Sequence, residues 1–230
     1  FKQKTAYEIY QCDWSSDVCS SDLVLTRLRE PTVASVSEND YSALIGKLVN
    51  DAKREVEDSW NWECLKSTYT IETSSGTTSY SLDGAGQKFK LYEAINDTNN
   101  WYLTERSAAF MTENYSLIPT PITGPTTDYA FNGLDVDGDV QVDIYPQPAG
   151  VYTLRFNGFT AEPELSDNSD STKLPKSPIV ALAWAKAIEE RGEDGGVNIS
   201  SQYAVAKQSV ADHIAIEASR RPEESIWYWV

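Results

Sequence analysis

Closely spaced aspartates are the residues of this sequence most suggestive of chemistry. Asp135, Asp137 and Asp139 alternate around Gly138, and Asp143 follows shortly after. Alternating carboxylates are typical of loops that bind Ca²⁺ through oxygen atoms. The rest of an EF-hand loop, with its distal glutamate, is absent from the segment. A hairpin turn in which Gly138 takes a positive φ explains the same spacing. We favour the turn and predict no metal site, with a metal at Asp135–Asp139 as the alternative.

The single histidine, His213, is the residue on which a histidine-dependent catalytic device would depend. A Ser–His–Asp or Cys–His arrangement needs such a side chain. His213 lies beside Val210 and Ile214 in a segment of helical period, which indicates a core or interface residue. No pattern pairs it with Cys64, and the sequence contains no Walker loop, GxGxxG or CxxC motif. We therefore predict no catalytic residues, no cofactor and a protein that is not an enzyme.

Three tryptophans offer another kind of binding chemistry. Trp60, Trp62 and Trp101 could stack on sugar rings, which makes a carbohydrate- or receptor-binding β-rich virion module an alternative function. Packing between helices and strands explains the same residues, above all for Trp60, which continues an apolar helical stripe. We favour packing.

A long amphipathic helix, expected over residues 37–65, must position most of these groups. Ser37 and Asp40 fit a capping box at its start. The spacing of its apolar residues by three and four predicts one buried stripe, whereas Lys53 and Glu57 are expected on a charged outer face. We predict that the following residues form the core: Leu44, Ile45, Leu48, Val49, Ala52, Val56, Trp60, Trp184, Ile188 and Ile214.

Short alternating segments between residues 67 and 160 predict strands with local, antiparallel connections. Helical period returns after Ser177, where Pro178 fits the first helical position, and again at about 200–219. The predicted fold class is α+β: a bundle of the long N-terminal helix and two C-terminal helices, carrying an antiparallel β-rich insertion.

The first 23 residues differ from the rest of the chain. FKQKTAYEI and DWSSDVCSSDL resemble the translation of a sequencing-library adapter. We expect residues 1–23 to be an artefact that replaces the authentic N-terminus. Residues 24–30 then read as the end of a helix that Pro31 stops. Setting this segment aside removes Cys12 and Cys19, so that Cys64 alone remains and no disulfide is expected.

The charge and hydropathy of the chain argue against nucleic acid and membrane as binding partners. The chain has 19 basic and 35 acidic residues, a net charge of −16, which argues against a site that grips nucleic-acid phosphates. No apolar run approaches the roughly 20 residues of a membrane-spanning helix. We therefore expect a soluble intracellular or virion-borne protein with no membrane partner.

Four segments resemble head-to-tail adaptor, or connector, proteins of tailed double-stranded DNA phages, especially those with short tails. They are NDAKREVEDSWNW (50–62), INDTNNWYL (95–103), YPQPAGVYTLRFNGF (145–159) and ALAWAKAIEERGEDGG (181–196). The resemblance implies a single adaptor domain over 24–230, with helical parts at 24–66 and 174–221, an insertion at 67–160 and a tail at 222–230.

The resemblance also implies a place of action and partners. The protein would form a ring, of twelve copies in this family, between portal and tail in the phage neck, after assembly in the host cytoplasm. Portal and tail proteins would be its partners, and DNA would pass through the channel without specific binding. An apolar aromatic tail ends the chain, and we predict that it makes subunit contacts. Its residues are Ile226, Trp227, Tyr228, Trp229 and Val230.

Overall fold

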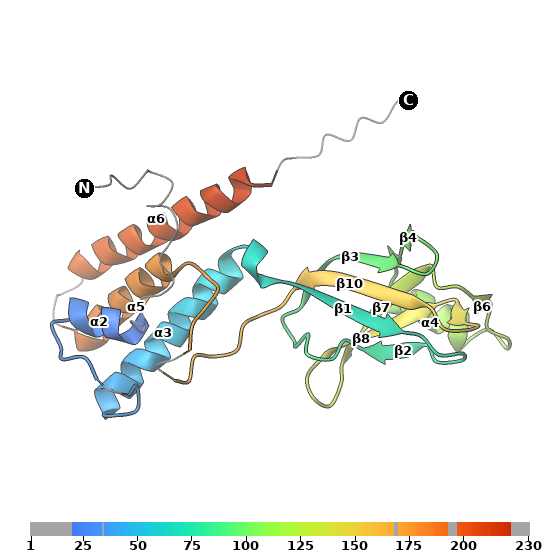
Figure 1. Cartoon of the computed structure of the whole chain (residues 1–230), viewed down its shortest axis with the longest axis horizontal. Coiled ribbons are helices and arrows are strands. Elements are labelled where there is room, and N and C mark those ends of the chain that lie inside the picture. The colour runs from blue at the N-terminus through green and yellow to red at the C-terminus, as the bar shows by residue number, and fades with distance from the viewer. Residues whose placement is uncertain (1–19, 34, 168–169, 193–196, 222–230) are drawn as a thin grey trace, which may run out of the picture. The chain divides into compact units, whose positions relative to one another are not determined.

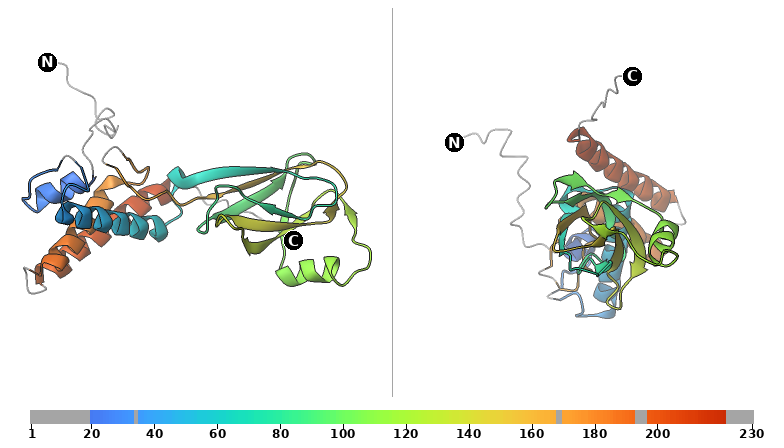
Figure 2. Two further views of the ribbon diagram at one scale, coloured as in Figure 1. Left: turned by 90° about the horizontal axis from the view of Figure 1, so that it is seen from below. Right: turned by 90° about the vertical axis from the view of Figure 1, so that its right-hand side faces the viewer.

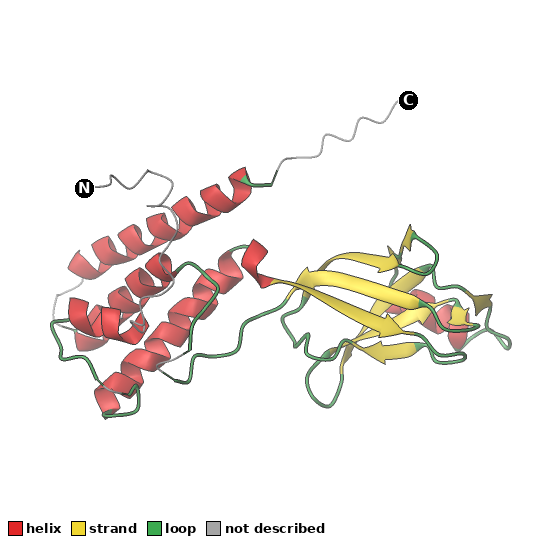
Figure 3. Cartoon of the chain, in the orientation of Figure 1, coloured by secondary structure: helices red, strands yellow, loops and turns green. Residues whose placement is uncertain are grey.

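The computed structural model describes residues 20–33, 35–167, 170–192 and 197–221. The chain divides into two compact units, which are treated separately below. The helical unit contains residues up to Ser59 and from Glu164 onward, and the β unit contains Trp60–Pro163. Figure 3 shows that the first unit contains helices and the second mainly strands, and the predicted α+β class is confirmed.

The described residues of the helical unit form four helices: α2 (Ser20–Arg27), α3 (Asp40–Ser59), α5 (Lys176–Arg191) and α6 (Val197–Ser219). The middle of the bundle is α5, which packs against α2, α3 and α6 (Figure 1). The predicted packing of the long N-terminal helix with the two C-terminal helices is therefore confirmed. Within the described part of the chain, no helix combines the length and apolarity required to cross a bilayer.

The long helix is shorter than predicted at both ends. Its start is capped by Asn39, whose side-chain oxygen accepts from the Ser42 amide at 2.8 Å, while the Ser42 hydroxyl accepts from the Asn39 amide at 3.1 Å. This reciprocal pair satisfies two amides at the helix start. The predicted cap at Ser37 is wrong because Ser37 instead bonds to Ser35 in the preceding turn. The helix ends at Ser59, and Trp62 is already extended.

A left-handed residue ends α2, before the proline that was expected to stop it. Arg29 has a φ of 60°, and the Glu30 amide bonds to the Leu25 carbonyl at 3.0 Å. This is the Schellman pattern of a helix C-terminus. At the other end, Ser20–Leu23 form the first turn of α2. Residues 1–19 lie outside the described residues, and an adapter origin for 1–23 stays a prediction.

Burial separates the predicted core residues into two groups. Ile45, Val49, Ala52 and Val56 are buried on α3. The other six are half-buried: Leu44, Leu48, Trp60, Trp184, Ile188 and Ile214. The α5 helix contributes an almost continuous buried surface to the centre of the bundle, since Ile179, Val180, Leu182, Ala183, Ala185 and Ala187 are all buried.

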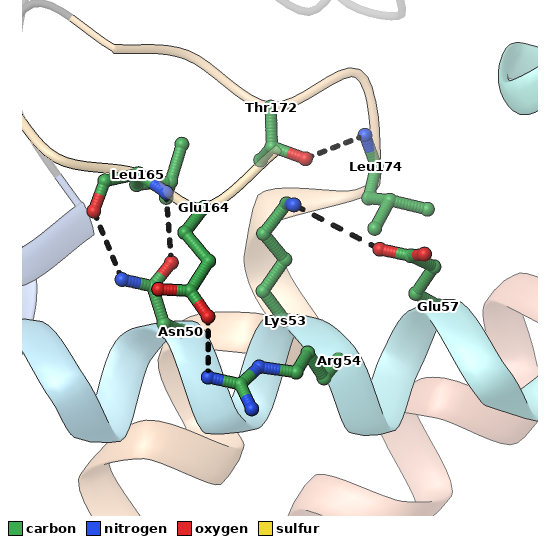
Figure 4. Close-up of polar contacts among 8 residues, drawn as sticks. All are labelled: Asn50, Lys53, Arg54, Glu57, Glu164, Leu165, Thr172 and Leu174. Carbon is green, nitrogen blue, oxygen red and sulfur yellow. Dashed lines mark hydrogen bonds and ion pairs between the residues drawn. The ribbon is translucent and has the colours of Figure 1, made fainter. Parts of the chain in front are cut away.

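Lys53 and Glu57 are not on a solvated face, contrary to the prediction. Their side chains are only 2% and 7% exposed, and Lys53 Nζ lies 3.7 Å from Glu57 Oε2. The strap, which is the segment 164–174 with 168 and 169 outside the described residues, crosses this face of α3 (Figure 4). A chain segment distant in sequence therefore covers residues whose helical spacing suggested exposure.

The β unit begins with a short 3₁₀ turn, η1 (Glu63–Leu65), and contains one helix, α4 (Ala108–Tyr115). Its first sheet has the order β1-β10-β3-β4 and its second the order β2-β8-β7-β5, while β6 pairs with β9. The strand bounds are β1 Lys66–Glu72, β2 Ser79–Ser81, β3 Lys90–Asn96, β4 Trp101–Tyr102, β5 Thr104–Glu105, β6 Thr123–Gly124, β7 Asp128–Leu134, β8 Val140–Tyr145, β9 Gln147–Pro148 and β10 Thr153–Phe159.

Figure 2 shows the strands of the β unit from two further sides. Buried apolar side chains of the two larger sheets form one core. Leu154 and Phe156 of β10 face Val142 and Ile144 of β8, and all four side chains are buried. The long strand pairs are antiparallel, as predicted. Two short pairs, β5 with β7 and β6 with β9, are parallel, contrary to the expectation of antiparallel pairing throughout. Two-residue strands carry no alternation from which their direction could be predicted.

Candidate functional site

The aspartate cluster forms a closed turn between β7 and β8. One carboxylate oxygen of Asp135 accepts from the amides of Asp137 and Asp139, both at 2.9 Å, and the other accepts from the Ser81 hydroxyl. Gly138 has a φ of 88°, as the hairpin-turn interpretation predicted. Donation by the Ser81 hydroxyl, followed by donation from the Asp139 amide, lowers the pKa of Asp135 below its usual value.

Asp139 ties this turn to the loop after β2. Its carboxylate accepts from the amides of Gly84 at 2.7 Å and Gly86 at 2.8 Å. Carboxylate oxygens of Asp83, Asp135 and Asp139 also lie within 4.8 Å of one another. The hydrogen bonds that Asp135 and Asp139 accept from backbone amides and Ser81 join the two loops, which supports the turn interpretation.

The candidate catalytic residues have local structural roles. His213 is half-buried on α6, and its Nδ1 lies 2.7 Å from the Ser209 carbonyl one turn earlier. Cys64 is half-buried in η1 of the β unit. His213 thus belongs to the helical unit and Cys64 to the β unit.

The tryptophans proposed to stack on sugars are mostly engaged in packing. Trp62 is buried, so its ring presents no face to a ligand. Trp101 packs against the β core and its Nε1 donates to the Thr126 carbonyl at 2.9 Å. Trp60 is half-buried after the end of α3. This geometry favours the packing interpretation over a sugar platform.

Five exposed apolar side chains belong to strands and loops toward one end of the β unit, away from the paired residues Lys66 and Phe159. We call Tyr102, Leu117, Ile118, Ile122 and Val151 the apolar rim. Tyr102 is 71% exposed, Leu117 73% and Val151 68%. Large apolar side chains grouped on a surface are typical of protein interaction sites.

Strand register brings the parts of the apolar rim to the same end. Pairing of Asn96 with Trp101 places Tyr102 there, and pairing of Glu72 with Thr153 places Val151 there. The Gln147 amide donates to the Ile122 carbonyl at 3.0 Å, which attaches the loop after α4. The sequence reasoning missed this surface. The sequence feature that could have indicated it is the set of apolar residues flanking the prolines of the loop 117–122, where burial in a core is not expected.

The outermost helix, α6, is also incompletely covered within its own unit. It packs on α5, and among its described side chains only Ala206 is buried. Val205 and Ile216 are exposed. The predicted contact residues Ile226–Val230 follow this helix and lie outside the described residues.

The comparisons with known proteins agree with a role in assembly. No curated protein matches the chain. A family model described as SU10 adaptor protein matches residues 21–224. Since this match spans most of the sequence, the chain belongs to the SU10 adaptor protein family, a family of phage adaptor proteins.

Proposed function

We propose that this protein is a head-to-tail adaptor that joins the portal to the tail as a ring of twelve copies around the DNA channel. The observation that carries the proposal is the family match over residues 21–224, which makes the protein a phage virion adaptor. The protein acts through assembly rather than catalysis. Its partners are copies of itself, the portal protein and tail proteins.

Exposed apolar surfaces support this proposal. The apolar rim of the β unit and the open face of α6 each offer side chains suited to protein contacts. Contacts between different surfaces of identical chains close into a ring when the rotation between copies fits. In this proposal α6 and Ile226–Val230 contact neighbouring copies, and the apolar rim contacts a neighbouring copy or the tail.

The charge of the chain supports a channel that does not retain DNA. A net charge of −16 opposes contact with phosphates, because neutralising them requires clustered lysine and arginine. Translocating DNA would therefore not bind the wall of the ring.

Co-purification with a portal ring tests the proposal. The full chain, mixed with the portal protein of its phage, should form a complex that mass photometry resolves as portal plus a fixed number of adaptor copies. Deletion of Ile226–Val230 should reduce the number of adaptor copies per portal. Absence of any portal complex with the full chain would overturn the adaptor function, whereas a normal complex from the truncated chain would overturn only the role of the tail.

A further inference from the structure

A cavity of about 300 Å³ lies in the helical unit, where the chain turns from α2 into α3. Leu25, Pro31 and Val33 contribute apolar walls, and Tyr41 and Arg191 contribute an aromatic ring and a guanidinium group. This volume is at the lower end for ligand sites and suits one large side chain rather than a cofactor.

Contacts among three elements hold the cavity in shape. Arg191, in the last turn of α5, donates from Nε to the Tyr41 hydroxyl at 2.8 Å and also pairs with the Glu30 carboxylate. Its guanidinium carbon lies 5.1 Å from the centroid of the Tyr41 ring. Since Glu30 follows α2 and Tyr41 lies in the first turn of α3, the Arg191 side chain connects α2, α3 and α5. A preformed cavity lowers the ordering cost of binding.

The chemistry of the walls suits an indole. Apolar walls favour an aromatic ring, and a guanidinium group such as that of Arg191 stacks on aromatic faces. The Glu30 carboxylate is an acceptor suited to an indole N–H. The chain itself carries two such side chains, Trp227 and Trp229, in the nine residues that follow Arg221.

The length of the C-terminal tail favours a tail from another copy as the occupant of the cavity. The 23 residues of α6 span about 33 Å, and the helix ends on the side of the bundle opposite the turn between α2 and α3 (Figure 1). The eight residues that follow Ser219, up to Trp227, extend over at most about 28 Å. The tail of the same copy would therefore approach this cavity only if it were almost fully extended.

We propose that the tryptophans of Ile226–Val230 in one copy dock into the cavity lined by Leu25, Val33, Tyr41 and Arg191 in a second copy. The inference rests on the self-assembly proposed above and adds the receiving site for the tail. The C-terminal tail and the cavity are different surfaces, so the contact is heterologous and can be repeated from copy to copy around a ring.

Peptide binding tests the cavity directly. A fluorescein-labelled peptide with the sequence of residues 221–230 is titrated with the full chain carrying Trp227→Ala and Trp229→Ala, and anisotropy is measured. We expect saturable binding that weakens at least about tenfold when Val33→Trp fills the cavity. Thr32→Trp, at a neighbouring exposed position that does not line the cavity, should leave affinity unchanged. Absence of saturable binding at about 1 mM receptor, or equal binding by the Val33→Trp variant, would overturn the proposal.

Photo-crosslinking separates docking between copies from docking within one copy. Full chains with benzoylphenylalanine at position 229 are mixed with larger, tagged chains, and the crosslinked peptides are identified by mass spectrometry. Crosslinks from position 229 to residues 25–42 of the other chain are expected, and crosslinks confined to the same chain would overturn the second-copy assignment. A portal complex that forms normally while both tests fail would leave the adaptor function standing and remove only this inference.

Discussion

In the β unit, the ring of Phe89 and the backbone of Lys90 lie so close to Gly158 that there is no room for a Cβ atom. A Cβ atom on Gly158 of β10 would lie 2.3 Å from Phe89 Cε2 and 2.8 Å from the Lys90 carbonyl oxygen. Phe89 belongs to the buried core, so its ring has little room to move away. The register between β10 and β3 also shifts at this residue. Gly158 therefore lets a core aromatic ring pack directly on the backbone.

Gly158→Ala should destabilise the β unit by about 2 kcal/mol, because overpacking of this size forces side chains and backbone to shift. Urea denaturation followed by circular dichroism measures the loss. The matched control is Gly150→Ala, since a Cβ atom there meets nothing within 4 Å and the backbone has no positive φ. The control should change stability by less than about 0.5 kcal/mol. Equal effects of the two substitutions would show that the Phe89 contact is not tight.

At the scale of elements, the strap, which has no regular secondary structure, makes polar contacts with α3. Asn50 donates to the Leu165 carbonyl and accepts from the Leu165 amide, both at 2.9 Å (Figure 4). The side-chain amide thus satisfies both backbone groups of Leu165, as a neighbouring strand would. Next to it, the strap covers the Lys53–Glu57 pair, whose charges are desolvated.

Glu57→Leu should destabilise the helical unit by about 3 kcal/mol, because it leaves the Lys53 ammonium buried without that carboxylate. The double variant Lys53→Met, Glu57→Leu should recover more than half of the loss, since apolar side chains of similar volume need no compensating charge. Thermal and urea unfolding of the single and double variants measure this coupling. An additive result would contradict it.

Arg54→Ala provides the control on the same helix. Its guanidinium lies 2.8 Å from Glu164 of the strap, but both side chains are about half exposed or more. An exposed pair contributes less than about 1 kcal/mol. A larger loss from Arg54→Ala than from Glu57→Leu would mean that the exposed pair, not the buried one, holds the strap on α3.

Periodicity predicted elements whose own residues carry a clear alternation or helical spacing. Strand β8, Val140–Tyr145, lies in the region 67–160 where strands were predicted, and burial alternates along it as the sequence alternation indicates. Burial of Lys53 and Glu57 was not predictable, since it depends on a strap more than 100 residues away in sequence. The cavity at Arg191 was missed for the same reason: its walls come from α2, α3 and α5, and no sequence window contains them together.

At the scale of the whole molecule, the two units differ in how the chain builds them. The helical unit combines segments that precede and follow the β unit in the sequence, whereas the β unit is one continuous stretch with its own core. The two ends of that stretch are close together, since Lys66 pairs with Phe159 and the Thr160 amide donates to the Leu65 carbonyl at 3.0 Å. A continuous stretch with adjacent ends and a separate core has the properties of an independently folding domain.

A polypeptide of residues 60–163 should therefore fold alone. We expect a cooperative thermal transition, a β-type circular dichroism spectrum and slow amide exchange at Leu154 and Phe156, which lie in the central strand of the first sheet. Gly158→Ala should lower the midpoint of this transition by about 10 °C, as expected for a loss of about 2 kcal/mol in a domain of about 100 residues. Residue 57 lies outside this polypeptide, so Glu57→Leu cannot affect it. An unfolded 60–163 polypeptide would favour the predicted single adaptor domain, in which the insertion requires the helices in order to fold. A folded polypeptide would mean that the helical unit and the apolar rim can be mutated independently when their contributions to assembly are measured.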